Sequence, residues 1–415
     1  MIDAHGSAGP RVGGFPGVIA LSSSSDTSER DRRFSFEQAS DLRVDRLAVS
    51  AYRVPTDGPD GKESDGTLEW ASTTMVLVEV RAGGVAGLGY TYADASVASL
   101  IESTLEPAVL GSDPLCVASI WRRMVDQLRN VGQPGAGFMA LSAVDVALWD
   151  LKAKLLGLPL FKALDPFHDS AAVYASGGFC NYPVERLVSQ VSGWVEQGIP
   201  RIKIKISRDP DRDPERLTRC RAAIGDATLL LTDSNGALSR KQALYWARRL
   251  REDWQVVWLE EALSSDDRVG LRWLRERGPA GLEITAGEYG SVLRDFNDLL
   301  QAEAVDCLQP DVTRCGGITG LRQVSALCSA HHIDVSAHCA PALSAHAFCA
   351  VERLRHLEYF HDHVRIEQRF FDGVLCPIGG RLHPDPGRPG LGLELKRSDA
   401  EPYLVHRAAA QLEAR

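Results

Sequence analysis

The sequence predicts an α/β fold built on a closed parallel barrel, because short strands and helices alternate strictly over its second half. From Ala172 onwards, short apolar and β-branched segments recur roughly every 20 to 30 residues, with helical periodicity between them. Eight such strands favour a barrel over an open sheet. An open doubly wound sheet normally carries a glycine-rich phosphate turn after its first strand, and Ser176-Gly-Gly-Phe179 lacks that spacing. The predicted strands are 173–176, 201–206, 228–233, 256–260, 283–286, 304–309, 333–337 and 355–359.

A smaller α+β domain is predicted before the barrel, where three strands precede three helical segments. The chain between the first two strands, 55–70, is too polar and too rich in glycine and proline for a regular element, which predicts a long loop. The proline- and glycine-rich tail predicts an extended segment that returns to this first domain. The predicted organisation is a disordered extension at 1–40, an α+β capping domain at 43–168, the barrel at 169–375 and the returning segment at 376–405.

Composition limits the possible partners and compartment. The chain has 415 residues and a net charge of -9 without a long basic run, which argues against nucleic acid and anionic membranes as partners. No apolar stretch reaches transmembrane length, and the start lacks the features of a secretory signal. Nine scattered cysteines without a CxxC pair indicate free thiols in a reducing cytoplasm. We therefore expect a cytoplasmic protein.

The second predicted strand, Arg201–Ile206, alternates basic and isoleucine residues, so Lys203 and Lys205 share one face. Lysines also occur on edge strands, where they discourage pairing with other chains, and the strand alone favours that interpretation. Two neighbouring lysines repel each other, however, and would be stabilised by negative groups in front of them. The strands that follow supply such groups.

Seven consecutive predicted strands end in an ionisable residue. The carboxyl ends of barrel strands meet at one face, which is where barrels place their active sites. A barrel without a site at this face would show a few such residues rather than an unbroken series. The residues are Lys205, Asp233, Glu260, Glu288, Asp311, His338 and Glu358.

Three of these residues, Asp233, Glu260 and Glu288, predict a metal site. Converging carboxylate oxygens suit a hard divalent cation, and with water and substrate oxygens completing an octahedron the expected ion is Mg²⁺. Each carboxylate taken alone is more commonly a helix cap or a surface charge. Glu261 follows Glu260 directly, and only one of two adjacent strand residues can face the metal.

Asp311 and His338, on neighbouring strands, predict a general base, because a carboxylate fixes the tautomer of an imidazole and raises its basicity. Lys205 stands across the barrel mouth, and we expect the metal and Lys203 to lower its pKa so that it also exchanges protons. Glu358, if protonated, could donate to a substrate carboxylate. Together these groups suit removal of a proton α to a carboxylate, with a cation stabilising the enediolate.

At these residues the chain resembles the mandelate racemase subgroup of the enolase superfamily, over about 43–396. The resemblance implies an α+β capping domain, a modified (β/α)7β barrel and a C-terminal segment that returns to the cap. It also implies that Lys203, Lys205, Asp311, His338 and Glu358 are catalytic. Ala262 stands where most members have proline, which would loosen that turn. The matching motifs are Lys203-x-Lys205, Asp233-x-Asn235-Gly, Glu260-Glu261, Gly287-Glu288, Asp311, Gly316-Gly-Ile-Thr-Gly320, His338 and Glu358.

The resemblance implies dehydration of an acid sugar to a 2-keto-3-deoxy acid as the commonest reaction. His338 or Lys205 would abstract the C2 proton according to its configuration, and His338 is the preferred acid for the leaving hydroxyl. A racemase or epimerase, and a cycloisomerase of a sugar-acid lactone, are the alternatives. A non-catalytic binding protein is more remote, because such a protein would be expected to lose some of the ionisable set.

The substrate is expected to be a small carboxylate whose identity depends on the capping domain, and we expect a homo-oligomer. In the family, the loop between the first two strands covers the substrate, which places Thr67, Glu69 and Trp70 among the candidates. A mobile surface loop is an equally good interpretation of that segment. Tyr92, Phe179 and Asn235 are further candidates at the same mouth.

Overall fold

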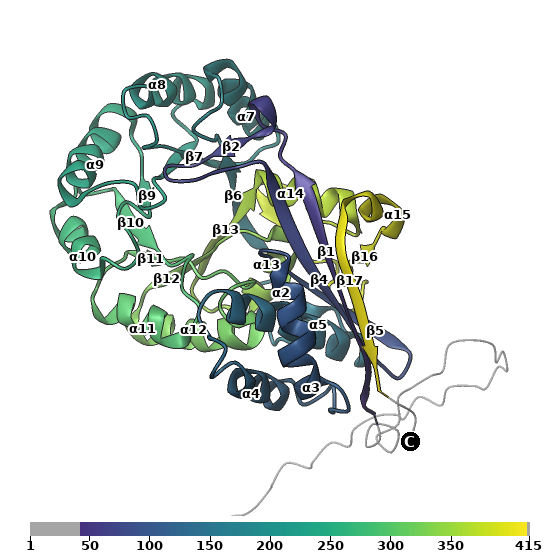
Figure 1. Ribbon diagram of the computed structural model, residues 1–415. Coiled ribbons are helices and arrows are strands. Elements are labelled where there is room, and N and C mark those ends of the chain that lie inside the picture. The colour runs from purple at the N-terminus through teal and green to yellow at the C-terminus, as the bar shows by residue number, and fades with distance from the viewer. Residues whose placement is uncertain (1–41, 413–415) are drawn as a thin grey trace, which may run out of the picture. The chain divides into compact units, whose positions relative to one another are not determined.

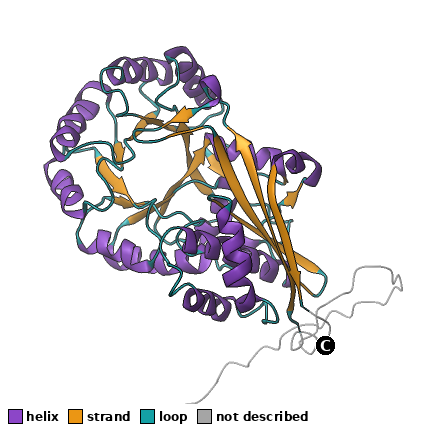
Figure 2. Ribbon diagram, viewed as in Figure 1, coloured by secondary structure: helices purple, strands orange, loops and turns teal. Residues whose placement is uncertain are grey.

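The computed structural model describes residues 42–412, so the predicted extension at 1–40 lies outside the described range. Its second half is a closed barrel of eight parallel strands, in which the last strand pairs with the first, for example Leu357 with Val173 (Figures 1 and 2). The prediction of a barrel rather than an open sheet is confirmed. The strands are β6 (Ala171–Gly177), β7 (Arg201–Lys205), β8 (Leu229–Asp233), β9 (Trp258–Glu260), β10 (Glu283–Ala286), β11 (Cys307–Leu308), β12 (Asp334–Ala337) and β13 (Leu354–Phe360).

Helices surround the barrel, and most of them pack an apolar face against it (Figure 2). In α7, for example, Val184, Leu187, Val191 and Trp194 are buried at helical spacing. No helix within 42–412 is long and apolar enough to cross a membrane. The helices are α7 (Val184–Glu196), α8 (Asp213–Ile224), α9 (Arg240–Trp254), α10 (Arg268–Arg277), α11 (Leu293–Gln301), α12 (Gly317–His331), α13 (Pro341–Ala347) and α14 (His361–Phe370).

The N-terminal α+β domain is an antiparallel sheet covered by helices. The sheet order is β17-β1-β4-β5, with β1 (Val44–Pro55), β4 (Ser72–Ala82), β5 (Val85–Tyr92) and β17 (Leu404–Gln411). Glycines let β5 approach the longest helix closely, because a Cβ on Gly89 would lie 2.3 Å from the carbonyl oxygen of Ala143. The helices are α2 (Ser96–Leu100), α3 (Glu106–Val109), α4 (Val117–Gln127), α5 (Ala136–Leu155) and α6 (Leu160–Ala163), with a π-helical turn at Ile101–Leu105.

The prediction of a three-stranded sheet was wrong, because β17 pairs with β1 as a fourth strand. Residues 408–410 are alanines, which have little strand preference, so the sequence carried only a weak strand signal there. The preceding stretch contains three short strands and a short helix that pack on elements already built. These are β14 (Phe371–Asp372), which pairs with β16 (Glu394–Leu395), β15 (Arg381–Leu382), which pairs with β6, and α15 (Arg397–Ala400).

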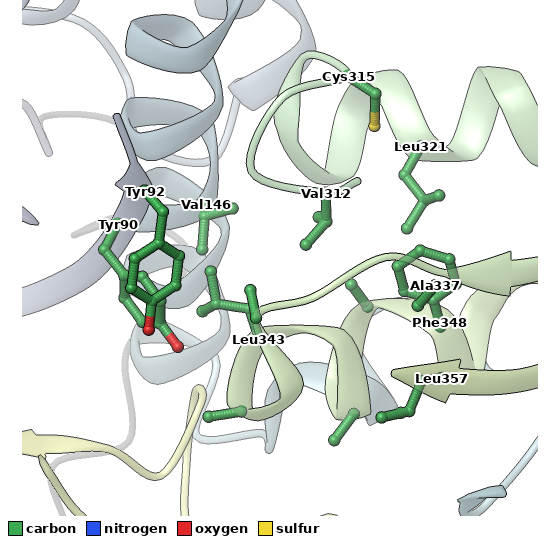
Figure 3. Close-up of a cluster of buried hydrophobic side chains, with 14 of the residues drawn as sticks. Tyr90, Tyr92, Val146, Val312, Cys315, Leu321, Ala337, Leu343, Phe348 and Leu357 are labelled. Carbon is green, nitrogen blue, oxygen red and sulfur yellow. The ribbon is translucent and has the colours of Figure 1, made fainter. Parts of the chain in front are cut away.

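A continuous apolar core joins this domain to the barrel. Tyr90 and Tyr92 of β5 lie beside Val146 of α5 and Leu343 of α13, as Figure 3 shows. The Tyr90 hydroxyl donates to Glu367 Oε1 at 2.6 Å, so the polar tip of the ring is also satisfied at this boundary. The core fixes the sheet, and with it the segment between β1 and β4, against the barrel.

That segment contains a capping hairpin, defined here as residues 62–70, in which β2 (Glu63–Ser64) pairs with β3 (Glu69–Trp70). The prediction that 55–70 holds no regular element was therefore wrong. The hairpin is tied to the loop after β6: the Cys180 amide donates to the Ser64 oxygen at 2.7 Å, and the Ser64 amide donates to Asn181 Oδ1 at 3.1 Å. These partners lie more than a hundred residues along the chain, so no local pattern announces them.

Candidate active site

Three carboxylates from adjacent strands form the centre of the site. Asp233 and Glu260 are the last residues of β8 and β9, Glu288 follows β10, and each offers an oxygen within 4.8 Å of the others. All three are buried, and Glu288 Oε2 receives no hydrogen bond from the residues described. Three buried carboxylates facing one point repel each other unless a cation lies between them. The donor set therefore fits the predicted Mg²⁺.

Lys203 and Lys205 face these carboxylates, as strand alternation predicts. Lys203 forms an ion pair with Glu260 and lies 2.8 Å from Glu358 Oε1, while Lys205 forms an ion pair with Asp233. Both lysines are buried, which excludes the edge-strand interpretation for this pair. Burial opposes the charged form of Asp233, but the two lysines outweigh it and hold its pKa below the usual value.

The lowered pKa of Lys205 and the protonated Glu358 stay predictions for the metal-loaded site, and the protein groups alone act in the opposite direction. Burial favours neutral Lys205, but the Asp233 carboxylate outweighs burial and raises the lysine pKa. Burial likewise favours neutral Glu358, yet the Lys203 ammonium holds the Glu358 pKa well below its usual value. Without a metal, the ion pairs therefore favour the charged forms of both Lys205 and Glu358.

Asp311 and His338 form the predicted dyad. Nδ1 of His338 lies 2.7 Å from Asp311 Oδ2, and Thr313 donates to the other Asp311 oxygen through its amide and its hydroxyl, each at 2.7 Å. Burial favours neutral His338, but Glu288 and the bond to Asp311 raise its pKa. With Nδ1 turned to Asp311, Nε2 faces the carboxylate cluster, 3.3 Å from Glu288 Oε2.

The lysines and the dyad approach this cluster from opposite sides of the barrel. The strand order runs β6 to β13, so β7 and β11 are four strands apart in a ring of eight. Lys205 is on β7, whereas Asp311 follows β11 and His338 follows β12. A substrate bound at the cluster would meet a proton-transfer group on each face.

Glu260 has two further partners that the sequence analysis missed. Trp258 Nε1 donates to Glu260 Oε2 at 3.0 Å, and Gln309 Nε2 donates to the same oxygen at 2.7 Å. Trp258 lies two residues before Glu260 on the same strand face, so strand alternation could have identified it. Burial raises the Glu260 pKa to about 8, against the opposing effect of Lys203.

Glu261 points away from the cluster. Its carboxylate accepts from the Ser265 hydroxyl at 2.6 Å and from the Gly287 amide at 2.9 Å. Ala262, in the position where proline is usual, is completely buried, and the turn before it is held by a bond from the Glu261 amide to the Thr285 oxygen.

The predicted substrate contacts divide between the hairpin and the barrel. Trp70 packs edge-on against Phe179 with ring centroids 5.4 Å apart, and the Thr67 hydroxyl donates to the backbone oxygen of Asn235 at 3.3 Å. The buried Asn235 Oδ1 has no hydrogen-bond partner among the described residues, which leaves it available to a ligand.

Tyr92 stacks on His363 and its hydroxyl turns toward Glu367, so it belongs to the boundary between cap and barrel.

Gly66 lets the hairpin sit directly on the barrel mouth. A Cβ at this position would lie 2.3 Å from the Ser234 oxygen and 3.0 Å from the Ile206 oxygen, both backbone atoms that cannot turn aside. We expect Gly66→Ala to displace the hairpin at a cost of about 1–3 kcal/mol and to raise KM. Limited proteolysis should cut the hairpin faster than in wild type. Gly193→Ala, where an added Cβ meets open space, is the matched control, and equal rates in both variants would contradict the expectation.

Glu63 of the capping hairpin belongs to a second acidic cluster. Glu63 is completely buried; its Oε1 accepts from the Tyr182 hydroxyl at 2.9 Å, and its Oε2 has no hydrogen-bond partner among the described residues. Asp57, His361 and Asp362 each place a polar atom within 4.8 Å of it. Arg186 pairs with Asp57 at 3.0 Å and Arg365 pairs with Asp362 at 3.1 Å, and Glu63 forms no ion pair with any cation in 42–412. Burial and then Asp362 raise the pKa of Glu63 to about 10.

Because of this raised pKa, the contribution of Glu63 to the free energy of unfolding is predicted to fall as the pH rises. Between its ordinary value of 4.5 and about 10, the folded protein holds a proton that the unfolded chain has released, so the free energy of unfolding falls with increasing pH. Glu63→Gln removes that titration, and its advantage over wild type should grow to about 1–3 kcal/mol between pH 5 and pH 9. Denaturant titrations across that range would measure it. Glu69→Gln, exposed on the same hairpin, should not show this growing advantage, and a wild type more stable than Glu63→Gln at pH 9 would contradict the prediction.

Two models of protein families match the chain. Residues 62–164 match the N-terminal domain of mandelate racemase/muconate lactonizing enzyme, and residues 186–400 match the enolase C-terminal domain-like family. A 3,6-anhydro-α-L-galactonate cycloisomerase from Streptomyces coelicolor is 31% identical, over 85% of this chain and 97% of its own. An L-talarate/galactarate dehydratase from Salmonella typhimurium is 30% identical, over 82% of this chain and 88% of its own.

Solved structures of similar proteins have the same fold as this chain. A mandelate racemase/muconate lactonizing enzyme-like protein from Rubrobacter xylanophilus is 58% identical, with a TM-score of 0.86 over 88% of this chain and all of its own. The Salmonella dehydratase, liganded with Mg and L-lyxarohydroxamate, has a TM-score of 0.82 at 27% identity, over 95% of this chain and all of its own. The chain therefore belongs to the mandelate racemase/muconate lactonizing enzyme family of the enolase superfamily.

Proposed function

We propose that the protein is a Mg²⁺-dependent acid-sugar dehydratase, which converts a polyhydroxy carboxylate into a 2-keto-3-deoxy acid. The observation that carries the proposal is the placement of two proton-transfer groups, Lys205 and the His338–Asp311 dyad, on opposite sides of one carboxylate cluster. Dehydration needs a base at C2 and an acid at the C3 hydroxyl, and this arrangement offers one group for each task.

Asp233, Glu260 and Glu288 would hold the metal. When bound, Mg²⁺ supplies positive charge that stabilises the enediolate oxygens of the substrate. Gln309 and Trp258 fix the orientation of Glu260 from behind, as partners of a ligating carboxylate do in metal sites. Glu261, which is bound to Ser265 and Gly287, takes no part in this ligand set.

The remaining steps belong to the side chains. His338 Nε2 or Lys205 Nζ, according to the C2 configuration, takes the C2 proton, and the C–H electron pair moves into the carboxylate. The C3–O bond then breaks, the opposite group protonates the departing hydroxyl, and water and an enol result. Transfer of a proton to C3 of the enol gives the 2-keto acid.

Lys203, held by Glu260 and Glu358, supplies the ammonium donor toward the enediolate, and Asn235, Thr67 and Trp70 line the substrate side.

Cycloisomerisation of a lactone or anhydro-sugar acid is the second candidate, because a cycloisomerase is 31% identical to this chain. It uses the same opposed groups without net loss of water. Racemisation or epimerisation at C2 would also need only these two groups.

Incubation of the Mg²⁺-loaded protein with a library of acid sugars and their lactones tests the proposal. A 2-keto-3-deoxy product, detected with a carbonyl reagent and by a mass loss of one water, is the expected result. An isomeric product of unchanged mass would show that the reaction is cycloisomerisation and not dehydration. C2 deuterium exchange with no keto product would favour epimerisation. Absence of Mg²⁺ binding in calorimetry would overturn all three.

A further inference from the structure

Cys339 follows the catalytic histidine directly and turns its thiol back into the site. Its Sγ lies 3.3 Å from His338 Nε2 and 3.4 Å from Glu358 Oε2. The third side of this triangle, from His338 Nε2 to Glu358 Oε2, measures 3.8 Å. A thiol, an imidazole and a carboxylate thus converge in a buried space, and the dehydratase mechanism uses no thiol.

The triangle has the dimensions of one face of a tetrahedral zinc site. Zinc bonds of about 2.3 Å to sulfur, 2.0–2.1 Å to nitrogen and 2.0–2.2 Å to oxygen place tetrahedral ligands about 3.4–3.6 Å apart. The three observed separations, 3.3, 3.4 and 3.8 Å, bracket that interval. The fourth position would be left to water or to a substrate oxygen.

The three groups are already oriented for this role. Asp311 accepts from Nδ1 of His338, which leaves the lone pair on Nε2, and such carboxylate–histidine pairs are the usual support of zinc-binding imidazoles. Lys203 Nζ lies 2.8 Å from Glu358 Oε1 and so leaves Oε2 for the triangle. The Cys339 amide donates to that Oε2 at 3.0 Å, and the Ser344 hydroxyl donates to the Cys339 oxygen at 2.8 Å, which fixes the backbone between them.

The ligand chemistry separates this site from the neighbouring one. Asp233, Glu260 and Glu288 offer only oxygens, which suit Mg²⁺, whereas a thiolate with an imidazole suits Zn²⁺ and Co²⁺. We propose that His338, Cys339 and Glu358 form a second metal site, selective for thiophilic divalent ions, whose occupation blocks the general base. On binding, the thiol proton passes to solvent and the thiolate and Nε2 each donate an electron pair to the metal. Nε2 then has no lone pair with which to take a C2 proton.

Cobalt reports the site directly, because a thiolate–Co²⁺ bond gives an intense charge-transfer absorption in the near ultraviolet that an all-oxygen site lacks. Full-length protein with excess Mg²⁺ is titrated with Co²⁺, and the band should rise to about one equivalent and disappear on addition of Zn²⁺. Cys339→Ser should lose the band. The double variant Cys116→Ser/Cys376→Ser, which lacks the two exposed thiols of the described chain, should keep it.

A wild type without the band, or a Cys339→Ser variant that keeps it, would overturn the proposal. Glu358→Gln provides a second variant in case serine disturbs folding; it retains the thiol and should weaken Co²⁺ binding by about tenfold or more. Unchanged affinity in that variant would also count against the site.

The inhibitory consequence rests on the proposed function, whereas the binding does not. With a substrate in hand, Zn²⁺ should inhibit wild type at about tenfold or more lower concentration than it inhibits Cys339→Ser, each relative to its own zinc-free rate. Equal inhibition of wild type and Cys339→Ser by Zn²⁺ would show that metal binding at this site does not block the general base. A cobalt band that depends on Cys339 in a protein that turns over no acid sugar would leave the metal site standing and overturn only the dehydratase.

Discussion

His338→Asn is expected to lower turnover by about 10²–10⁴-fold, because it removes the only ring nitrogen that faces the carboxylate cluster from the dyad side. Asparagine can still donate to Asp311 from its amide, as Nδ1 of the histidine is placed to do at 2.7 Å, so the buried carboxylate keeps a partner. The loss should therefore appear in kcat and in C2 deuterium exchange, with the fold and Mg²⁺ affinity preserved.

A matched control is available in His332→Asn. His332 is exposed at the end of α12 with a φ of 57°, a left-handed conformation that asparagine adopts readily. This variant should keep wild-type turnover. If His338→Asn also turned over at close to the wild-type rate, Lys205 would be the sole proton-transfer group. If Lys205→Ala left exchange intact while His338→Asn abolished it, the lysines would act only through their charge.

The second large effect is expected for Glu260→Gln, which should weaken Mg²⁺ binding by about 100-fold or more. Loss of a supporting partner behind a metal ligand already costs 10–100-fold, and removal of the ligand's own charge costs more. The amide also leaves Lys203 with only Glu358 and Asp233 as negative neighbours. Calorimetric titration with Mg²⁺ measures the affinity, and activity should fall with it and recover in part at high Mg²⁺.

Glu261→Gln is the control, since it changes the adjacent residue in the same chemical way. Its amide can still accept from Gly287 and can donate to Ser265, so the turn keeps its bonds. We expect Mg²⁺ affinity within about threefold of wild type, a change of under 1 kcal/mol. If the two variants lost equal affinity, Glu260 would not be the ligand that distinguishes this site.

The barrel could be predicted because its pattern is local and repeated. Seven of the eight strands are short apolar runs that lead to an ionisable residue, and closure brings all those residues to one face whatever the error in a strand's ends. β11 is only Cys307–Leu308, although 304–309 was predicted, yet Asp311 still reaches His338. Position at a strand end was enough to bring the dyad together.

The protonation states could not be predicted in this way, because they depend on which partner each group finds. A lowered pKa of Lys205 was predicted for a site that holds a metal, whereas among the protein groups alone its ion pair with Asp233 raises that pKa. Glu358 was predicted to act as a donor if protonated, and the Lys203 ammonium beside it holds its pKa well below the usual value. A one-dimensional pattern gives neighbours on a face, not the distances that decide between competing charges.

The capping hairpin was missed for a different reason. Trp70 is the one apolar residue of its two short strands, and a two-stranded ladder of this size is marginal by itself. It is held by groups such as Cys180 and Asn181, which lie more than a hundred residues away in the sequence. Cys339 was likewise overlooked, because one cysteine among nine has no spacing that sets it apart.

The seating of Gly66 on the Ser234 and Ile206 backbones has a kinetic consequence. The groups beneath it are nearly sealed from solvent, with Asp233, Glu260 and His338 at most 5% exposed, so we expect the substrate to enter or leave when the hairpin lifts. Turnover then has a ceiling set by the opening of this gate and not by the strength of any base. For fast substrates, kcat should fall in proportion to solvent viscosity, while slow substrates, limited by proton abstraction, should show a deuterium isotope effect at C2 instead.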